Sequence, residues 1–197
     1  MRSVPGWFHV EPRPDRRTGT SIMDAVQPPT LRPMTAADWP AVREVWAAGI
    51  ATGLATFETE PPSWTSFDAT RLPGHRHVAT DGSGAVLGWV SCSRESPREA
   101  YAGVVEHSVY VAPGAQGRGV GRLLLQGLVD STEADGIWTI RAAVLPANTG
   151  SLAMHEQLGF RVLGRRERVG RRIVDGRATW HDVLLVERRS RIVGWVD

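Results

Sequence analysis

Apolar residues recur at helical spacing in two stretches of the chain. Residues 36–50 follow Thr35 and contain Asp38, either of which can cap the start of a helix. The apolar positions of this stretch are Ala37, Val42, Val45, Trp46 and Ile50. Residues 120–134 repeat the pattern with Val120, Leu123, Leu124, Leu128 and Val129. The spacing predicts a helix over each range, and a third, shorter helix is predicted over residues 151–158.

The segments between these helices predict strands. Two of the strands are joined by the turn Asp81–Gly84, whose glycines tolerate the positive φ that a tight hairpin turn requires. Residues 63–74 fit neither pattern clearly. The predicted strands cover residues 30–34, 75–80, 85–93, 104–111, 138–144, 160–168 and 178–187. Strands that alternate with helices and hairpins predict an α/β fold, in the form of an α+β sandwich.

Length and composition limit the class of protein. The chain has 197 residues, 42% hydrophobic and 22% charged, which suits one globular domain of ordinary core size. Cys92 is its single cysteine, so the chain forms no internal disulfide. No run of about 18 apolar residues occurs, so no membrane span is expected. The net charge of +2 is too small to indicate a nucleic-acid partner.

The domain is expected to span residues 30–190. Residues 1–29 contain prolines and arginines without apolar periodicity, which predicts a flexible extension, and Met23 offers a second possible start. The same residues lack the apolar core of a secretory signal, so a cytoplasmic protein is expected. Residues 191–197 are predicted to form a short C-terminal tail.

A glycine-rich turn leads from a predicted strand into the helix over 120–134. Gly117, Gly119 and Gly121 let several backbone N–H groups point at one spot, where the positive end of the helix dipole adds to them. Arg118 and Arg122 can add charge-assisted hydrogen bonds, so the turn suits a phosphate or pyrophosphate. A turn that merely starts a helix remains the alternative for the glycines alone.

Two other phosphate-binding motifs do not fit this turn. A P-loop needs a lysine followed by Ser or Thr, and the chain contains no lysine. A dinucleotide fingerprint needs an acidic residue at the end of the next strand. Glu133 and Asp135 lie instead in the last turn of the predicted helix.

The sequence resembles the GCN5-related N-acetyltransferase (GNAT) superfamily at two motifs. Gln116–Gly121 is similar to its acyl-CoA pyrophosphate loop, and Asn148–Phe160 is similar to its Asn-x-x-Ser-x-x-x-Tyr helix followed by Leu-Gly-Phe. Three further segments resemble its phosphinothricin acetyltransferase subfamily, namely Ala55–Pro61, Arg98–Tyr101 and Val105–Val111. The resemblance implies a mixed, mostly antiparallel central sheet with helices on both faces, splayed where acetyl-CoA binds.

The resemblance also implies how the co-substrate is held. Main-chain groups of the strand at Val109, Tyr110 and Val111 would bind the pantetheine arm. Two residues of the downstream helix motif, Asn148 and Ser151, would complete the site. The pyrophosphate would contact the loop residues Gln116, Gly117, Arg118, Gly119, Val120, Gly121 and Arg122.

Glu106 is the candidate base of this chemistry. An amine must be neutral to attack a thioester, and the family uses a glutamate at this position to take its proton. His107 titrates in the useful range, but strand alternation places it on the opposite face, where a packed or surface histidine is expected. His155 replaces a tyrosine near the coenzyme A sulfur and either donates a proton to the leaving thiolate or only lines the groove.

The acceptor is expected to be a small toxic amino acid acetylated on its α-amino group. Phe57 would form a wall of its pocket, and Arg98 and Tyr101 would hold an acidic or sulfoxide head group, since arginine matches two oxygens. Another amine and a non-catalytic acyl-CoA sensor are the alternatives. Cys92 is expected to be buried in a strand, and no residues have the spacing of metal ligands. The family implies a homodimer and a role in detoxification or resistance.

Overall fold

A seven-stranded sheet organises the part of the chain that the computed structural model describes, residues 27–174 and 176–195. The strand order is β1-β2-β3-β4-β5-β7-β6, and every neighbouring pair is antiparallel except β4 and β5. The strands are β1 (Thr30–Pro33), β2 (His77–Thr80), β3 (Val86–Arg94), β4 (Val104–Val111), β5 (Thr139–Val144), β6 (Arg161–Val174) and β7 (Arg177–Arg189). The predicted mixed, mostly antiparallel sheet is confirmed.

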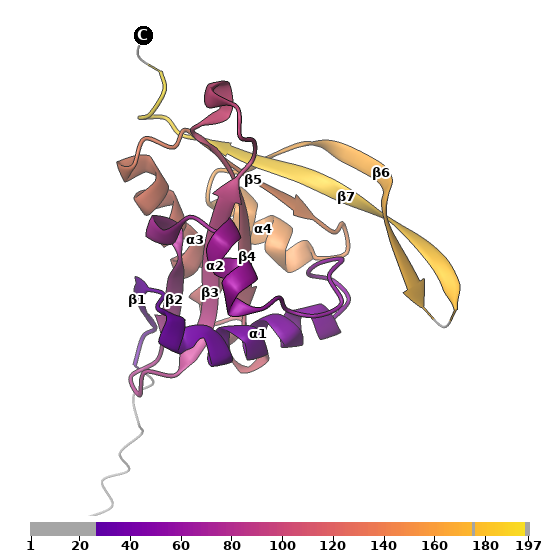
Figure 1. Ribbon diagram of the computed structural model, residues 1–197, viewed down its shortest axis with the longest axis horizontal. Helices are drawn as coiled ribbons and strands as arrows, with labels where there is room; N and C mark the ends of the chain where they lie inside the picture. Colours follow the sequence, from indigo (N-terminus) through magenta and orange to yellow (C-terminus); the bar gives the residue numbers. More distant parts are fainter. Residues whose placement is uncertain (1–26, 175, 196–197) are drawn as a thin grey trace, which may run out of the picture.

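Helices cover both faces of the sheet (Figure 1). On one face lie α1 (Trp39–Ala51) and α2 (Trp64–Thr70), which pack aromatic and aliphatic side chains against Val78, Trp89 and Tyr110. On the other face lie α3 (Val120–Ala134) and α4 (Thr149–Gln157). Buried leucines of α3 there meet a larger apolar cluster that includes Val90, Val105 and Ile140. Burial of two cores, one on each face, holds the sheet between the helices.

The parallel pair β4–β5 separates part of the way along its length. Its ladder holds for three residue pairs and ends at Glu106 opposite Arg141. Beyond that point β4 continues to Val111 and stays paired with β3, whereas β5 continues to Val144 and stays paired with β7. The two strands therefore diverge inside the sheet, and an opening flanked by strand edges lies between them.

Two segments differ from the helix predictions. The first helix begins as a 3-10 turn over Ala36–Asp38 and becomes α-helical at Trp39, with Pro40 in its first turn. The stretch left without a prediction contains α2, whose start is capped by Ser63 as it accepts from the backbone of Ser66. A helix of seven residues has too few apolar positions to show a period.

The last two strands are longer than predicted and project from the body as an arm (Figure 1). The sequence predicts that the first of these strands ends at residue 168 and that the second begins at residue 178. Ile173 and Trp180 are exposed there, so the outer part of the arm lacks the buried face that marks a strand in a sequence.

The ends of the chain are described in part. The predicted N-terminal extension falls outside the described residues over positions 1–26. At the other end, residues 191–195 fold back, because Ser190 Oγ accepts from the backbone of Ile192 and Val193 and the Arg189 guanidinium lies 5.1 Å from the Trp195 ring centre.

Candidate active site

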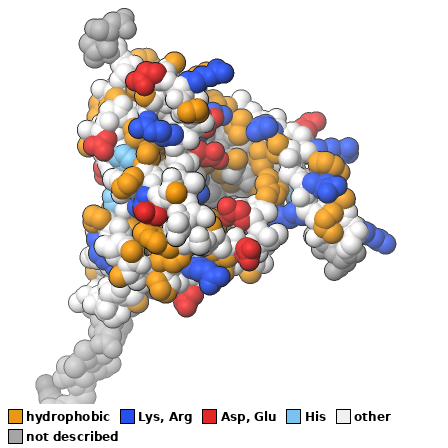
Figure 2. Space-filling view, viewed as in Figure 1, with side chains coloured by type: hydrophobic (Ala, Val, Ile, Leu, Met, Phe, Trp, Pro, Cys, Tyr) orange, Lys and Arg blue, Asp and Glu red, His pale blue; other side chains and the backbone are white. Residues whose placement is uncertain are grey.

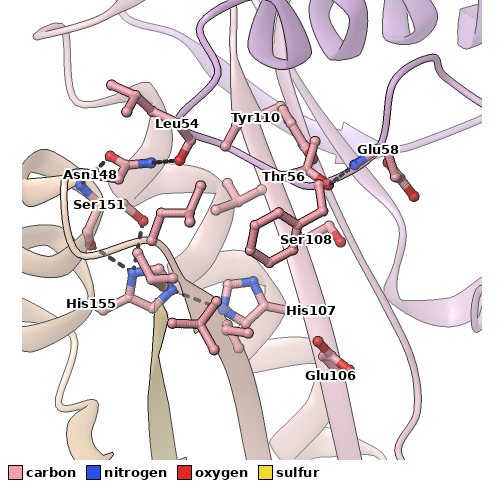
Figure 3. Close-up of a pocket in the computed structure, with 18 residues that line it drawn as sticks. Leu54, Thr56, Glu58, Glu106, His107, Ser108, Tyr110, Asn148, Ser151 and His155 are labelled. Atoms are coloured by element: carbon pink, nitrogen blue, oxygen red, sulfur yellow. Dashed lines mark hydrogen bonds between the residues drawn. The ribbon is translucent and has the colours of Figure 1, made fainter. Parts of the chain in front are cut away.

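A cavity of about 270 Å³ lies where β4 and β5 diverge. Glu106 to Tyr110 of β4 form one wall, and residues 142–145 form the opposite wall. Residues 54–58, which follow α1, close a third side, and the face of α4 closes the fourth (Figure 3). Of the residues predicted for the site, Glu106, Val109, Tyr110, Asn148, Ser151, His155 and Phe57 line this cavity.

Glu106 offers an unpaired carboxylate to the cavity. Its side chain is exposed, and within the described residues it forms no ion pair. The register of β4 against β3 runs without a bulge, so Glu106 and His107 point to opposite faces of the sheet. A carboxylate that forms no ion pair and is open to the cavity can accept a proton.

His107 lies against His155 on the face of the sheet that α3 and α4 cover. The two Nε2 atoms are 3.0 Å apart, and both rings are buried (Figure 3). His155 Nδ1 lies 2.7 Å from the carbonyl oxygen of Ser151. Burial lowers the pKa of both imidazoles, and that of His107 falls well below its usual value, helped by the charge of Arg71. Both rings are therefore neutral at physiological pH.

Asn148 joins α4 to the loop that closes the cavity. Its Oδ1 caps the helix by accepting from the backbone N–H of Ser151 at 3.2 Å. Its Nδ2 donates to the carbonyl oxygen of Leu54 at 3.3 Å (Figure 3). One side chain thus fixes both the start of the helix that carries His155 and the edge of residues 54–58.

The glycine-rich turn presents its backbone to solvent at the start of α3. Gly117 and Gly119 adopt φ of 73° and 78°, and a Cβ on either would meet nothing within 4 Å. In the described part of the chain, the N–H groups of residues 117–121 donate no hydrogen bond to a backbone or side-chain acceptor. The turn therefore offers free donors, with the exposed Arg118 and Arg122 beside them.

The side of the cavity formed by residues 54–58 is held by the β6–β7 arm. Arg172 of β6 donates to the carbonyl oxygens of Gly53 and Thr56, and its guanidinium lies 5.3 Å from the centre of the Phe57 ring. The ring also fills the space over Gly170, where a Cβ would overlap it. Phe57 thereby gains a fixed place in the cavity wall.

Arg98 and Tyr101 lie in a different place from the one expected for acceptor ligands. Both belong to the 3-10 turn Glu99–Tyr101 or its cap, both are exposed, and neither is among the described residues that line the cavity. Their proposed role stays a prediction. Val111 and the turn at 116–122 likewise lie outside the lining, at the far end of β4.

Sequence reasoning missed Arg71, which contacts a residue of the cavity wall. It caps the end of α2, and its Nη1 lies 3.4 Å from Ser108 Oγ, which lines the cavity. Arg71 is half-buried and has no carboxylate partner among the described residues. No motif in the sequence marks it, because α2 itself was not predicted.

Three other findings concern the cysteine, metal ligands and the helices. Cys92 is fully buried, and burial raises the pKa of its thiol to about 12, so it is no nucleophile. Among the described residues, no group of three or more His, Cys, Asp or Glu side chains could hold a metal ion. None of the helices in that part of the chain is long and apolar enough to cross a membrane.

Comparison with known proteins places this site in a family. The sequence model of the acetyltransferase (GNAT) family matches residues 39–160 of the chain. The chain is 32% identical over 163 residues to an L-methionine sulfoximine/L-methionine sulfone acetyltransferase of Pseudomonas paraeruginosa, covering 80% of this chain and 92% of the relative. It is 35% identical to a phosphinothricin N-acetyltransferase of Alcaligenes faecalis, covering 81% of each.

A solved structure agrees with the sequence relatives. The crystal structure of a GNAT superfamily phosphinothricin acetyltransferase from Sinorhizobium meliloti, in complex with acetyl-CoA, matches with a TM-score of 0.75 and 32% identity. The match covers 86% of this chain and 92% of that one. The chain belongs to the GNAT family of acetyltransferases.

Proposed function

We propose that this enzyme transfers the acetyl group of acetyl-CoA to the α-amino group of a small toxic amino acid, of the phosphinothricin or methionine sulfone and sulfoximine kind. The observation that carries the proposal is the cavity at the split of β4 and β5, with the unpaired carboxylate of Glu106 on its wall. The names of the relatives that match over most of the chain support the substrate class.

Acetyl-CoA binds along the turn before α3 and the exposed edge of β4. The free amides of residues 117–121 and the dipole of α3 suit its pyrophosphate, with Arg118 and Arg122 adding charge. The edge that β4 exposes where β5 leaves it offers main-chain groups at Val109 to Val111, beside which the pantetheine arm can lie like an added strand. The thioester then points into the cavity.

The chemical step needs a base and a wall that excludes water. Glu106 takes the proton of the acceptor amine, whose nitrogen then attacks the thioester carbonyl. Backbone amides of β4 stabilise the oxyanion as it forms. His155 lies on the opposite wall, where the thiolate of coenzyme A departs.

The acid group of the acceptor needs a cation, and Arg71 is placed to supply it. Ser108 and Glu106 point to the same face of β4, and the Arg71 guanidinium reaches Ser108. Arginine holds a carboxylate or phosphinate through two parallel hydrogen bonds. The cavity of about 270 Å³ suits a small amino acid better than a peptide chain.

We infer that two copies pair through the arm. Exposed apolar residues lie along it, and Figure 2 shows hydrophobic and basic side chains gathered on its surface. These residues are Val162, Leu163, Val169, Ile173 and Trp180. Several exposed large apolar residues on one arm are typical of an interface. Sedimentation of the wild type at twice the mass of I173D/W180D would support the dimer, and a monomeric wild type would exclude it.

The cellular role follows from the chemistry. Acetylation removes the positive charge of the α-amino group, and a toxin recognised through that charge is then inactive. The reaction consumes acetyl-CoA, which fits a cytoplasmic enzyme that confers resistance.

A thiol-release assay tests the proposal. Purified enzyme and acetyl-CoA are mixed with phosphinothricin, methionine sulfone, methionine sulfoximine, arsinothricin, an aminoglycoside and a peptide with a free N-terminus. Turnover with an amino-acid analogue supports the substrate class. Turnover with only the peptide or the aminoglycoside would overturn the substrate class and keep the acetyltransferase, whereas binding of coenzyme A without any turnover would indicate a sensor.

A further inference from the structure

His155 has both of its ring nitrogens occupied by protein groups. Its Nδ1 lies 2.7 Å from the carbonyl oxygen of Ser151, which only accepts hydrogen bonds, so Nδ1 must carry a hydrogen and donate it. A neutral imidazole carries a single N–H, and Nε2 of His155 is therefore a bare acceptor. That atom faces His107 Nε2 at 3.0 Å.

The state of His107 follows from that of His155. Its Nε2 must supply the hydrogen between the rings, because two bare nitrogens at 3.0 Å would repel each other. The Nδ1 of a neutral His107 then carries a lone pair and no hydrogen. This atom is fully buried and has no hydrogen-bond partner among the described residues. His107 is one of the residues that line the cavity, so the wall of the cavity includes a ring with one nitrogen that makes no hydrogen bond within the described residues.

We propose that His107 and His155 work as one unit, in which His107 is a positioning residue that locks His155 as the neutral Nδ1–H tautomer and leaves His107 Nδ1 as the only nitrogen of the pair that is free to accept a hydrogen bond or a proton. This inference rests on the proposed acetyl transfer for its catalytic consequence. The tautomers themselves follow from the geometry.

The surroundings keep the unit uncharged. Phe160 packs edge-on against His155, with ring centres 4.9 Å apart, and also against His107 at 5.7 Å. Arg71 approaches from the end of α2, and its charge disfavours a proton on His107. Glu106 points to the other face of β4, so no carboxylate on the strand offsets that effect. The wall on the coenzyme A side is thus neutral and fixed before substrates bind.

Glutamine and leucine at position 107 separate two roles of His107, the donation of a hydrogen bond to His155 and the filling of space. The amide nitrogen of glutamine can occupy the place of Nε2 and donate to His155, so H107Q keeps the lock. Leucine fills similar space and donates nothing, so H107L frees His155 Nε2. With its lock removed, His155 can turn or take a proton on Nε2.

Nitrogen-15 NMR of the ring nitrogens reads the tautomers directly. In the full-length wild type we expect a hydrogen on His155 Nδ1 and on His107 Nε2, with the other two nitrogens bare at pH 7. H107Q should keep the His155 signals. H107L should shift them and move the pKa of His155 upward. A wild-type spectrum with hydrogen on His155 Nε2 or on His107 Nδ1 would overturn the proposal.

Kinetics test the catalytic consequence. In the thiol-release assay we expect kcat of H107L to fall about tenfold or more with little change in KM for acetyl-CoA, and H107Q to recover most of the loss. Equal kcat in wild type and H107L would overturn the positioning role, and equal damage in both variants would reduce His107 to a packing residue. A wild type without turnover on any amine would refute the proposed function alone, because the NMR assignment would still decide the tautomers.

Discussion

Glu106 and Arg141 form the last matched pair of the β4–β5 ladder, yet the Arg141 guanidinium binds Glu95, at 2.5 Å, and not Glu106. Glu95 lies just beyond β3 and is about as shielded from solvent as Arg141. Because Arg141 binds Glu95, the carboxylate of Glu106 forms no ion pair with it. A base that is paired with a cation holds its proton less readily, so this arrangement favours proton acceptance by Glu106.

Replacing these two glutamates should therefore affect catalysis in different ways. Glu106→Gln removes the base, and kcat should fall about 10²- to 10⁴-fold. Glu95→Gln frees Arg141 to pair with Glu106, so activity near pH 7 should fall several-fold and recover when Arg141 is also changed to methionine. Thiol release across pH 6–9 measures both effects. Full activity of Glu106→Gln would exclude it as the base.

Gly119 should matter for acetyl-CoA binding beyond its contribution to folding. Alanine at φ 78° is strained and costs about 1 kcal/mol of unfolding free energy. Gly84 is a matched control, because it has φ 86° and equally open space but lies in the β2–β3 turn. Urea unfolding should show similar losses for both alanine variants, whereas only Gly119→Ala should raise the Kd for coenzyme A, by about tenfold in calorimetry. An equal Kd for coenzyme A in the two variants would show that the turn at Gly119 does not take part in binding.

Arg71 and Arg98 can be separated as ligands of the acceptor. Loss of a charged hydrogen-bond partner costs about 1.5–3 kcal/mol, so Arg71→Met should raise KM for the amino acid by about tenfold or more and leave KM for acetyl-CoA unchanged. Arg98 is exposed outside the cavity, and Arg98→Met should have little effect. The opposite result would assign the role to Arg98.

The structural features around the cavity that sequence predicted are those encoded locally. The glycines at 117–121 and the cap at Asn148 each lie within a few residues of the helix they start, so their spacing alone indicates their place. Alternation along β4 likewise separates Glu106 from His107. These features depend on backbone geometry over a single turn or strand.

The parts that sequence did not predict depend on contacts between distant segments. His107 and His155 are 48 positions apart, and a strand pattern says that a histidine is buried without naming its partner. Arg172 and Thr56 meet because the arm returns over the loop after α1. Periodicity reports one element at a time, so it could not reveal either contact.

The Arg32–Asp38 pair should make stability depend on pH. Two hydrogen bonds, of 2.8 and 2.6 Å, join their side chains, and together with hydrogen bonds from Thr35 they lower the pKa of Asp38 from 3.8 to about 2. The stabilisation is therefore complete above pH 3.8 and disappears as pH falls through about 2. Because Arg32 is 41% exposed, solvent screening limits it to about 1–2 kcal/mol. Urea unfolding of Asp38→Asn should show this loss at pH 7 and little at pH 2, with the exposed Asp130→Asn as control.

Gly170 should control acceptor binding through Phe57. A Cβ at this position would overlap the Phe57 ring, which must then leave its place in the cavity wall, although the Arg172 contacts to Gly53 and Thr56 can remain. Gly170→Ala should thus raise KM for the amino acid about tenfold while KM for acetyl-CoA stays constant. Gly164→Ala, on the same strand with nothing within 4 Å, is the matched control and should behave as wild type in the thiol-release assay. If both variants keep the wild-type KM, Phe57 does not contact the acceptor, and the wall must be assigned to other residues of the loop.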